Sequence, residues 1–205
     1  MKAARQAFTR ESADARRADL IEATAAVLAE AGLAGTTVRA ICTKAGVSPG
    51  LLRHYFEGID DLVAATYQAT SDRMDAIFAD AVDSAANDPR ARLTAYLTAS
   101  FRPPVTDPEL LGAWTAFWAL ARSDARMAGI HAESYAGYRE RLGELLVACG
   151  AEDAERVAIM LTAMVDGLWL ELSLDAASFG AEAAAAMIEK AVAALLDEQH
   201  RQREA

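Results

Sequence analysis

The sequence predicts an all-α protein: three short N-terminal helices in a helix-turn-helix domain, then a larger helical bundle, about nine helices in all. Its composition is alanine-rich and 53% hydrophobic, with only 12 glycines and 5 prolines in 205 residues. This composition favours helices because alanine has the highest helix propensity and few residues interrupt the pattern. Apolar residues recur at helical spacing, and no segment alternates as a strand does. We divide the chain into two domains, residues 1–58 and 59–205.

Glycine and capping signals set the bounds of the elements in the first domain. We expect a polar, mobile arm followed by three helices, over residues 1–12, 14–31, 38–45 and 49–56. Gly32 ends the first helix, since glycine readily adopts the left-handed conformation that closes a helix. The Thr37 and Ser48 hydroxyls are N-caps of the second and third helices. Pro49 occupies a first helical position, where its missing N–H does no harm.

Longer helices account for the second domain. We expect them over residues 60–82, 89–101, 108–121, 124–149, 157–174 and 181–203, the fourth as one long helix or two short ones. Asp88-Pro89 and Asp107-Pro108 each combine a capping aspartate with a proline in the first turn. Arg102-Pro103-Pro104 is a linker, and Gly150 ends a helix. These signals predict a helical bundle.

The helix expected over residues 157–174 is apolar on nearly all of its faces. Such a helix must be buried all round. A second copy of the chain covering one face, together with the helix over 181–196, would give a four-helix interface in a two-fold homodimer. The alternative is a helix that is central in the core of a single chain.

Charge is distributed unevenly along the chain. Residues 1–58 carry a net charge of +2, from eight basic and six acidic residues, although the whole chain carries −10. Residues 59–205 therefore carry −12. A mildly basic head permits nucleic-acid binding, since phosphate contacts need Lys and Arg, but it does not establish it.

No segment predicts export, a membrane span or a disulfide. The sequence contains no uninterrupted stretch of about 18 apolar residues and no signal-peptide pattern at its start. Cys42 and Cys149 fit neither disulfide nor metal-ligand spacing. We therefore expect a soluble, cytoplasmic protein that binds no metal and no cofactor.

Residues 36–56 hold the strongest signal in the sequence. Two short helices that cross steeply need a tight turn between them. Ala45 is small where the helices meet, Gly46 permits the turn, and Val47 fills the core between the helices. Leu52 and Phe56, four residues apart, hold the third helix on its buried side. The first residues of such a helix reach base edges in the major groove, which predicts a DNA-binding segment.

This segment resembles the helix-turn-helix of the TetR family of bacterial repressors, over about residues 14–63. The shared features are the Thr-capped helix, Ala45-Gly46-Val47-Ser48, and the run from Gly50 to Phe56. The resemblance implies a ligand-responsive repressor that binds double-stranded operator DNA as a homodimer. It implies phosphate contacts from Thr37, Ser48 and Tyr55, and base or adjacent backbone contacts from Arg39, Pro49, Gly50, Leu51 and Arg53, with His54 also exposed on this helix.

Several positions depart from the family pattern. Arg53 stands where the family usually has Tyr, and His54-Tyr55 replaces the more common Tyr-His order. Cys42 replaces the usual small Ala and is expected to be a buried, small apolar residue. Ile59 occupies the place of a Lys that normally meets a phosphate, so we expect Arg53 or the N-terminal arm to compensate.

Aromatic residues and one carboxylate stand out in the second domain. Trp114, Phe117 and Trp118 share one helix face by their spacing. Trp169 follows Asp166 by three residues in an apolar helix, where a carboxylate must be paired, hydrogen-bonded or functional. Aromatic ring faces and a carboxylate are what a quaternary ammonium ion needs. The competing interpretation is core packing of the tryptophans, or a place in the dimer interface for Trp169.

The two stretches that contain these residues, 114–119 and 166–170, resemble the C-terminal domain of BetI-type repressors, which sense choline. The resemblance implies an inducer that is choline or another small cationic amine. Tyr135 and His131, on the helix expected over 124–149, are further pocket candidates, whereas Glu171 is expected to be a solvated or interface charge. The alternative is a repressor of efflux or catabolic genes that senses an uncharged lipophilic ligand.

Two other classes of protein fit the sequence less well. We expect no enzyme, because His54, His131 and His200 do not cluster with Cys or carboxylates at metal-ligand spacing. The sequence also has no nucleophile-elbow motif and no phosphate-binding loop motif. A helical protein–protein adaptor would explain the acidic bundle but not the capped turn within residues 36–56.

Overall fold

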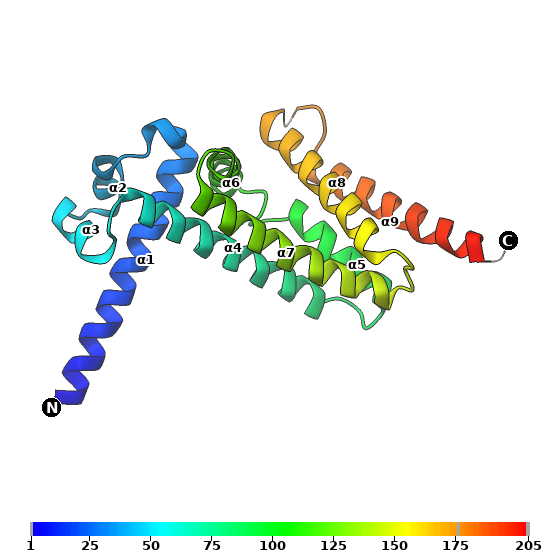
Figure 1. Cartoon of the computed structure of the whole chain (residues 1–205), viewed down its shortest axis with the longest axis horizontal. Coiled ribbons are helices and arrows are strands. Elements are labelled where there is room, and N and C mark those ends of the chain that lie inside the picture. The colour runs from blue at the N-terminus through cyan, green and yellow to red at the C-terminus, as the bar shows by residue number, and fades with distance from the viewer. Residues whose placement is uncertain (1, 176, 204–205) are drawn as a thin grey trace. The chain divides into compact units, whose positions relative to one another are not determined.

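The computed structural model describes the backbone of residues 2–175 and 177–203, and the side chains of residues 13–175 and 177–197. Within these ranges the chain forms nine α-helices and one short 3-10 helix, with no strand (Figure 1). The predicted all-α fold is confirmed. The side chains of the predicted arm and of His200 lie outside the described residues.

Most helix bounds agree with the prediction to within three residues. The helices are α1 (Lys2–Gly35), α2 (Val38–Ala45), α3 (Pro49–Tyr55), α4 (Ile59–Asp83), α5 (Pro89–Thr98), η1 (Ala99–Phe101), α6 (Pro108–Ala121), α7 (Ala125–Ala148), α8 (Ala154–Leu174) and α9 (Ala181–Arg203). The segment that left two alternatives open is one long helix, α7.

The first helix differs from the prediction at both ends. Its backbone is helical from Lys2, so residues 2–12, which were expected to precede the first helix as an arm, belong to it. Eight of these eleven residues are Ala, Arg, Lys, Gln or Glu, which favour a helix even where no apolar periodicity marks a buried face. At the other end Gly32 has φ 61° and ψ −169°, which interrupts the helix where the prediction ended it. A last turn then continues to Gly35.

Packing divides the chain into two compact units. Unit 1 consists of Met1–Thr70 and Gly112–Ile130, and unit 2 of Ser71–Leu111 and His131–Ala205. Helices α4 and α7 each contribute residues to both units. The predicted domains, residues 1–58 and 59–205, were defined by function and not by packing, and they stay a prediction.

In unit 1, helices α1, α2 and α3 and the start of α4 enclose one apolar core. Leu20, Ile41, Leu52, Phe56 and Leu62 are at most 3% exposed and belong to this core. Figure 1 shows α2 and α3 beside the C-terminal part of α1. A helix as short as α3 is not stable alone, so this core is what holds it in place.

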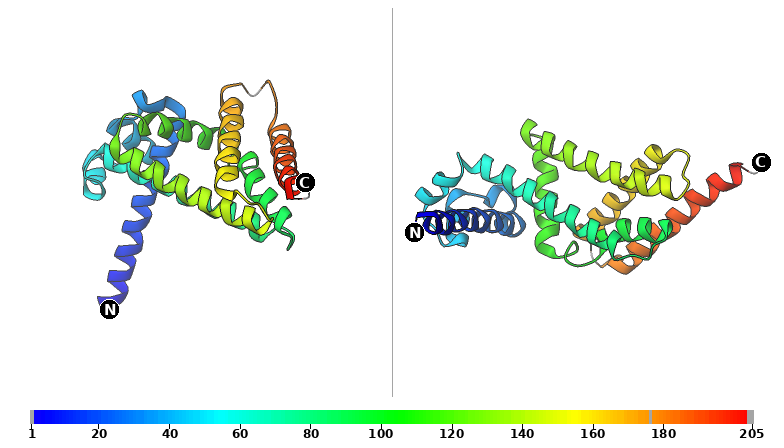
Figure 2. Two further views of the ribbon diagram at one scale, coloured as in Figure 1. Left: turned by 45° about the vertical axis from the view of Figure 1, so that its right-hand side comes forward. Right: turned by 90° about the horizontal axis from the view of Figure 1, so that it is seen from below.

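In unit 2, helices α8 and α9 lie side by side, and α5 packs against α9 (Figure 2). Leu93 and Leu97 of α5, Leu146 of α7 and Ile188 of α9 are fully buried. The unit therefore has its own apolar core, formed by residues far apart in the sequence.

Helix α8 buries one face and exposes the other. Val157, Leu161, Val165 and Trp169 follow one another at four-residue spacing and are at most 5% exposed. Large apolar side chains on the rest of the helix are exposed, namely Ile159, Met160, Met164, Leu170 and Leu174. The alternative of a helix that is central in the core of a single chain is therefore wrong, and burial of the exposed face by a second copy stays a prediction.

Among the described helices, α8 is also the one that is long and apolar enough to cross a membrane. This rests on length and composition alone, and a core helix of a soluble protein passes the same test. A third of this apolar stretch of α8 is buried within the described chain.

Candidate DNA-binding surface and ligand site

Side-chain caps fix the start of both helices in the helix-turn-helix. The Thr37 hydroxyl accepts a hydrogen bond from the Ala40 N–H at 3.2 Å, and the Ser48 hydroxyl accepts one from the Leu51 N–H at 3.3 Å. Pro49 occupies the first turn of α3. Because each cap uses an oxygen lone pair, its own O–H remains available to donate to another group, such as a phosphate. The predicted N-caps and helix starts are confirmed.

A glycine closes the turn between α2 and α3. Gly46 has φ 66° and ψ 32°, in the left-handed region that side-chain-bearing residues rarely adopt. The N–H of Val47 then donates to the carbonyl of Cys42 at 3.0 Å, which satisfies the end of α2. Lys44 forms an ion pair with Glu30 and so connects α2 to α1.

The residues under α3 explain two of the departures from the family pattern. Cys42 is 4% exposed and lies in the core cluster of unit 1, as expected of a small apolar residue. Ile59 is half-buried and packs against the same cluster. Phe56 is buried, and the guanidinium carbon of Arg17 lies 5.1 Å from the centroid of its ring. The apolar Ile59 is thus used for packing where a lysine would reach solvent.

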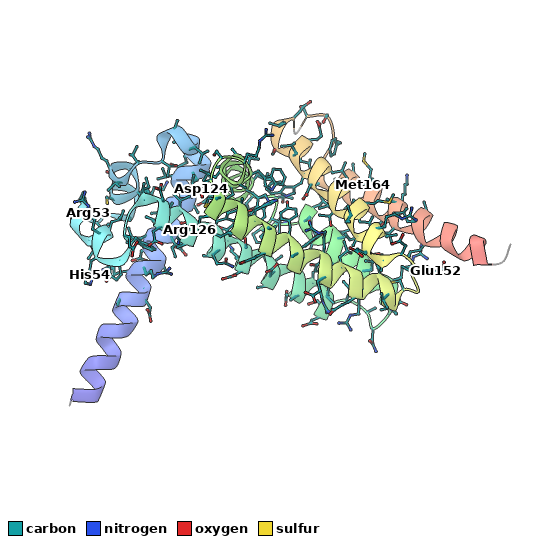
Figure 3. All side chains as sticks on the ribbon, in the orientation of Figure 1. Arg53, His54, Asp124, Arg126, Glu152 and Met164 are labelled. Atoms are coloured by element: carbon teal, nitrogen blue, oxygen red, sulfur yellow. The ribbon has the colours of Figure 1, made fainter. Side chains whose placement is uncertain are left out.

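The residues predicted to meet DNA are all accessible to solvent. Thr37, Arg39, Ser48, Pro49, Gly50, Arg53 and His54 are exposed, and Leu51 and Tyr55 are half-buried. The rings of His54 and Tyr55 meet edge to face, with centroids 5.1 Å apart. Figure 3 labels Arg53 and His54 on α3, where both project away from the ribbon.

Two arginines on this surface are not used by the fold. Arg39 and Arg53 make no hydrogen bond and no ion pair within the part of the chain that the structure describes. Their guanidinium groups are therefore free to bind phosphates or the acceptor atoms of guanine. This is the arrangement that a DNA-binding surface requires.

The aromatic residues of α6 pack inside unit 1. The rings of Tyr67 and Phe117 are stacked with centroids 4.4 Å apart, and Trp114 meets Tyr67 edge to face at 5.5 Å. Phe117 and Tyr67 are fully buried and Trp114 is 7% exposed, while Trp118 is half-buried. These rings fill the core of unit 1, which is the arrangement that the core-packing interpretation describes.

The carboxylate of α8 is hydrogen-bonded within unit 2. The Tyr135 hydroxyl donates to Oδ1 of Asp166 at 3.1 Å. Burial raises the pKa of Asp166 to about 6, although the Tyr135 hydrogen bond and the charge of Arg139 lower it. Trp169, one turn further along α8, is 4% exposed. The structure therefore brings Tyr135 and Asp166 together, as two of the candidate residues.

Charged and titratable neighbours surround Tyr135. The His131 ring lies 4.2 Å from the Tyr135 ring, and the guanidinium carbon of Arg139 lies 5.8 Å from it. Burial lowers the pKa of His131, and the positive charge of Arg139 lowers it further. His131 is therefore uncharged near neutral pH and adds an aromatic face to this group.

A second aromatic group of unit 2 was not identified from the sequence. The rings of Tyr96 and Tyr138 are stacked with centroids 5.0 Å apart, and Phe78 lies within 5.5 Å of both. The Tyr96 hydroxyl donates to the backbone carbonyl of Tyr138 at 3.1 Å. Burial raises the pKa of Tyr138 well above its ordinary value, and the charge of Asp166 raises it further.

Both halves of the chain match known families of regulators. Residues 20–66 match the family of bacterial regulatory proteins named for TetR, and residues 89–197 match the C-terminal domain of BetI-type transcriptional repressors. The chain is 37% identical over 188 residues to the regulator BetI of Rhizobium meliloti, covering 88% of this chain and 89% of that protein. It is 33% identical over 178 residues to BetI of Paraburkholderia xenovorans, covering 82% of this chain and 87% of that protein.

Solved structures show the same fold. A transcriptional regulator from Pseudomonas aeruginosa PAO1 is 40% identical and superposes with a TM-score of 0.83, covering 92% of this chain and 94% of that chain. A regulator from Saccharomonospora viridis, solved in complex with choline, has a TM-score of 0.77. It is only 14% identical, over 85% of this chain and 93% of that chain, so it speaks for the fold alone.

Proposed function

The chain belongs to the TetR family and is a BetI-like helix-turn-helix transcriptional repressor, and we propose that it binds its operator as a homodimer and releases it when a choline-like cation binds. The observation that carries the first part is Arg53 on the capped helix α3, which is exposed and has no ion pair among the described residues. The observation that carries the second part is the half-buried, hydrogen-bonded Asp166.

Helix α3 is the proposed DNA-reading element. Leu52 is buried, and by helical geometry Gly50 and His54 lie nearly opposite it, with Arg53 beside them. Gly50 has no side chain, so it allows the start of the helix to approach DNA closely. Arg53 has the geometry to donate two hydrogen bonds to a guanine. Thr37, Ser48 and Tyr55 are the proposed phosphate contacts, and Arg39, Pro49 and Leu51 complete the surface.

The exposed apolar face of α8 is the proposed dimer contact. Met160 and Met164 are 48% and 36% exposed, and Met187 of α9 is 41% exposed. Burying such a face against its copy stabilises a two-fold dimer. The two α3 helices must then lie roughly 34–36 Å apart to enter successive major grooves. Replacement of Met164, labelled in Figure 3, by Glu should give a monomer in sedimentation experiments, and an intact dimer would argue against this face.

The proposed cation site consists of Asp166, Tyr135 and Trp169, all in unit 2. A carboxylate with a lone pair still free balances the charge of an ammonium ion. Aromatic faces attract the same charge without the desolvation that a second carboxylate would bring. The stacked rings of Tyr96 and Tyr138 extend this chemistry. Trp114 and Phe117 pack against Tyr67 in unit 1, and we propose core packing as their role.

Helix α4 is the proposed connection between ligand and DNA. It is a single helix from Ile59 to Asp83, only three residues separate it from α3, and it contributes to both units. A ligand that favours a different spacing of the two α3 helices weakens DNA binding by the difference between its affinities for the two states.

The proposal is tested by titrating the protein–operator complex with choline and with its uncharged carbon isostere, dimethylbutanol. The operator is selected by the protein itself from a random-sequence DNA pool, and release is followed by fluorescence anisotropy. Choline should release the DNA and dimethylbutanol should not. If the uncharged compound releases DNA equally well, the inducer is a lipophile and the proposed cation site is wrong.

Further properties follow from the family. The relatives are transcriptional regulators, which are not enzymes, so we propose no catalytic activity. Regulators of this kind act on chromosomal DNA, so we propose a cytoplasmic location.

A further inference from the structure

A small hollow lies within unit 1, where three segments meet. Its walls come from the turn after Gly32, from the first turns of α4 and from the connection between α6 and α7. The lining residues are Leu33, Thr36, Ile59, Asp60, Val63, Leu120, Asp124, Arg126 and Met127. Its volume is about 190 Å³, which is enough for a small organic molecule. None of these residues belongs to the proposed cation site.

The floor of the hollow is apolar, and the backbone bends at Gly32, just before one of its walls. Val63 and Met127 are buried beneath it, while Leu33 is 38% exposed beside it. Leu33 directly follows Gly32, whose φ of 61° and ψ of −169° are accessible essentially only to glycine. Leu33 is thus a partly exposed apolar residue in the wall of the hollow, directly after this bend in the backbone.

The charges at the rim are unbalanced. Arg126 donates to Asp61 at 2.8 Å, and this contact holds the pKa of the Asp61 carboxyl below its ordinary value. The positive charge of Arg126 is therefore already matched. Asp60 and Asp124 form no ion pair within the described part of the chain. Asp124 uses Oδ1 to accept the Met127 N–H at 2.9 Å, which leaves its second oxygen free. Figure 3 labels Asp124 and Arg126 at the start of α7.

We propose that this hollow is a second binding site, distinct from the cation site of unit 2, and that its ligand is a small organic cation with a short apolar chain. The apolar floor takes the chain, and the Asp60 and Asp124 carboxylates take the charge. An anion is disfavoured by two carboxylates, and a neutral apolar molecule gains no attraction from them. A cation held there contacts the first turn of α4, which follows α3 by three residues.

The test uses n-hexylammonium as the probe and the full-length Asp166→Asn variant as the protein. The substitution disables the proposed cation site, so the outcome does not depend on the proposed inducer. The chain has 6 methionines, which give separate methyl signals after labelling with carbon-13. Met127 lies in the hollow, whereas Met160, Met164 and Met187 are exposed on α8 and α9. The Met127 signal is assigned from its loss in Met127→Leu.

We expect n-hexylammonium to shift the Met127 signal in a saturable manner and to leave those of Met160, Met164 and Met187 unchanged. The combination of Asp60→Asn and Asp124→Asn should weaken binding about tenfold, since two attractive charges are lost. Asparagine keeps the side-chain oxygen that caps α7. Asp14→Asn, which removes an exposed charge nineteen residues before Leu33, is the matched control and should leave the affinity unchanged.

Three results would overturn the proposal. The first is an unchanged Met127 signal at saturating probe. The second is an equal response to hexanol or hexanoate, which would mean apolar adsorption without recognition of charge. The third is equal shifts of all exposed methionines. Each of these results leaves the operator-binding function untouched, because operator affinity is measured separately on the same variant.

Discussion

The helix-turn-helix and the cation site hold their charges in opposite ways. Arg39 and Arg53 are exposed and unpaired within the described residues, so their charges stay solvated until DNA approaches. Asp166 is half-buried, accepts a hydrogen bond from Tyr135, and has its pKa raised to about 6 by burial. One region therefore binds through charges kept in water, and the other through a charge that the fold has partly desolvated.

This difference indicates which substitutions change binding alone and which also change the free energy of unfolding. An exposed, unpaired arginine adds little to folding, so its removal affects DNA binding alone. The ionisation of a partly buried carboxylate is unfavourable for folding and favourable for cation binding, so a change at Asp166 affects both. The apolar core under α3 is a third case, because its loss removes the surface that presents the arginines.

The largest effect is expected from Phe56→Ala, which removes part of the apolar core that supports α3. Phe56 is 3% exposed in the core of unit 1. Truncation of a buried phenylalanine typically lowers the free energy of unfolding by about 3–5 kcal/mol. Urea unfolding should show this loss together with loss of operator binding. An unchanged unfolding midpoint would contradict the buried position of the ring.

The next effect is expected from Arg53→Ala, which isolates the DNA contact. A base-reading arginine contributes about 1–3 kcal/mol of discrimination, so specific operator affinity should fall by about tenfold or more. The melting temperature and the dimer should be unchanged. Arg53→Lys keeps the charge but not the two-pronged geometry, so it should restore non-specific binding without restoring specificity.

Arg122→Ala is the matched control for Arg53→Ala. Arg122 is also exposed and unpaired within the described residues, but it directly follows α6 and does not belong to the helix-turn-helix. It should leave operator affinity nearly unchanged. If the two variants lose the same operator affinity, Arg53 contributes only its positive charge and no specific contact with a base.

A smaller effect, about tenfold in ligand affinity, is expected from pH. The pKa of Asp166 is about 6 in the folded chain, so about a tenth of the carboxylate is ionised at pH 5. Because choline itself does not titrate, its affinity by calorimetry should rise about tenfold between pH 5 and 7. His131→Gln should keep this dependence and Asp166→Asn should abolish it. The reverse pattern would assign the dependence to His131.

The same carboxyl group gives the opposite trend for stability. Its pKa in the folded chain, about 6, lies above its ordinary value of 3.8. Between these values the folded chain holds a proton that the unfolded chain has released, so this contribution to stability falls as pH rises toward 6. Asp166→Asn should remove this slope from thermal melts.

The smallest effect is expected from Ser48→Ala, which separates the role of Ser48 in capping α3 from its proposed contact with a phosphate. The Ser48 hydroxyl caps α3 through the Leu51 N–H. Loss of an N-cap lowers the free energy of unfolding by about 1 kcal/mol. If the same hydroxyl also donates to a phosphate, operator affinity should fall further than the stability loss explains. Ser48→Asp, whose carboxylate keeps the cap but has no hydrogen to donate, should recover the stability but not that phosphate contact.

The sequence was sufficient wherever a local signal determines the structure. The Thr37 and Ser48 caps, the Gly46 turn and the Pro49 start all act within four residues of themselves, so α2 and α3 were predicted almost to the residue. The helical residues 2–12 were missed because helix propensity there is not accompanied by apolar periodicity.

The neighbours of the candidate ligand residues come from distant parts of the sequence, so no local pattern predicts them. The rule that a carboxylate in an apolar helix must be paired led to Asp166, and its partner Tyr135 was among the candidates. Spacing on α6 predicted that Trp114 and Phe117 share a face, but not that Tyr67 of α4 covers it. The stacked Tyr96 and Tyr138 come from α5 and α7, 42 residues apart, so nothing in the sequence places them together.

The most direct test of the central claim is choline-dependent release of the operator by the wild type and by Asp166→Asn, measured by anisotropy at pH 7. The claim is that exposed arginines bind DNA and a partly buried carboxylate binds the effector. It predicts equal operator affinity of the two proteins without choline, and release by choline from the wild type only. If choline releases the operator from Asp166→Asn as readily as from the wild type, the claim is contradicted.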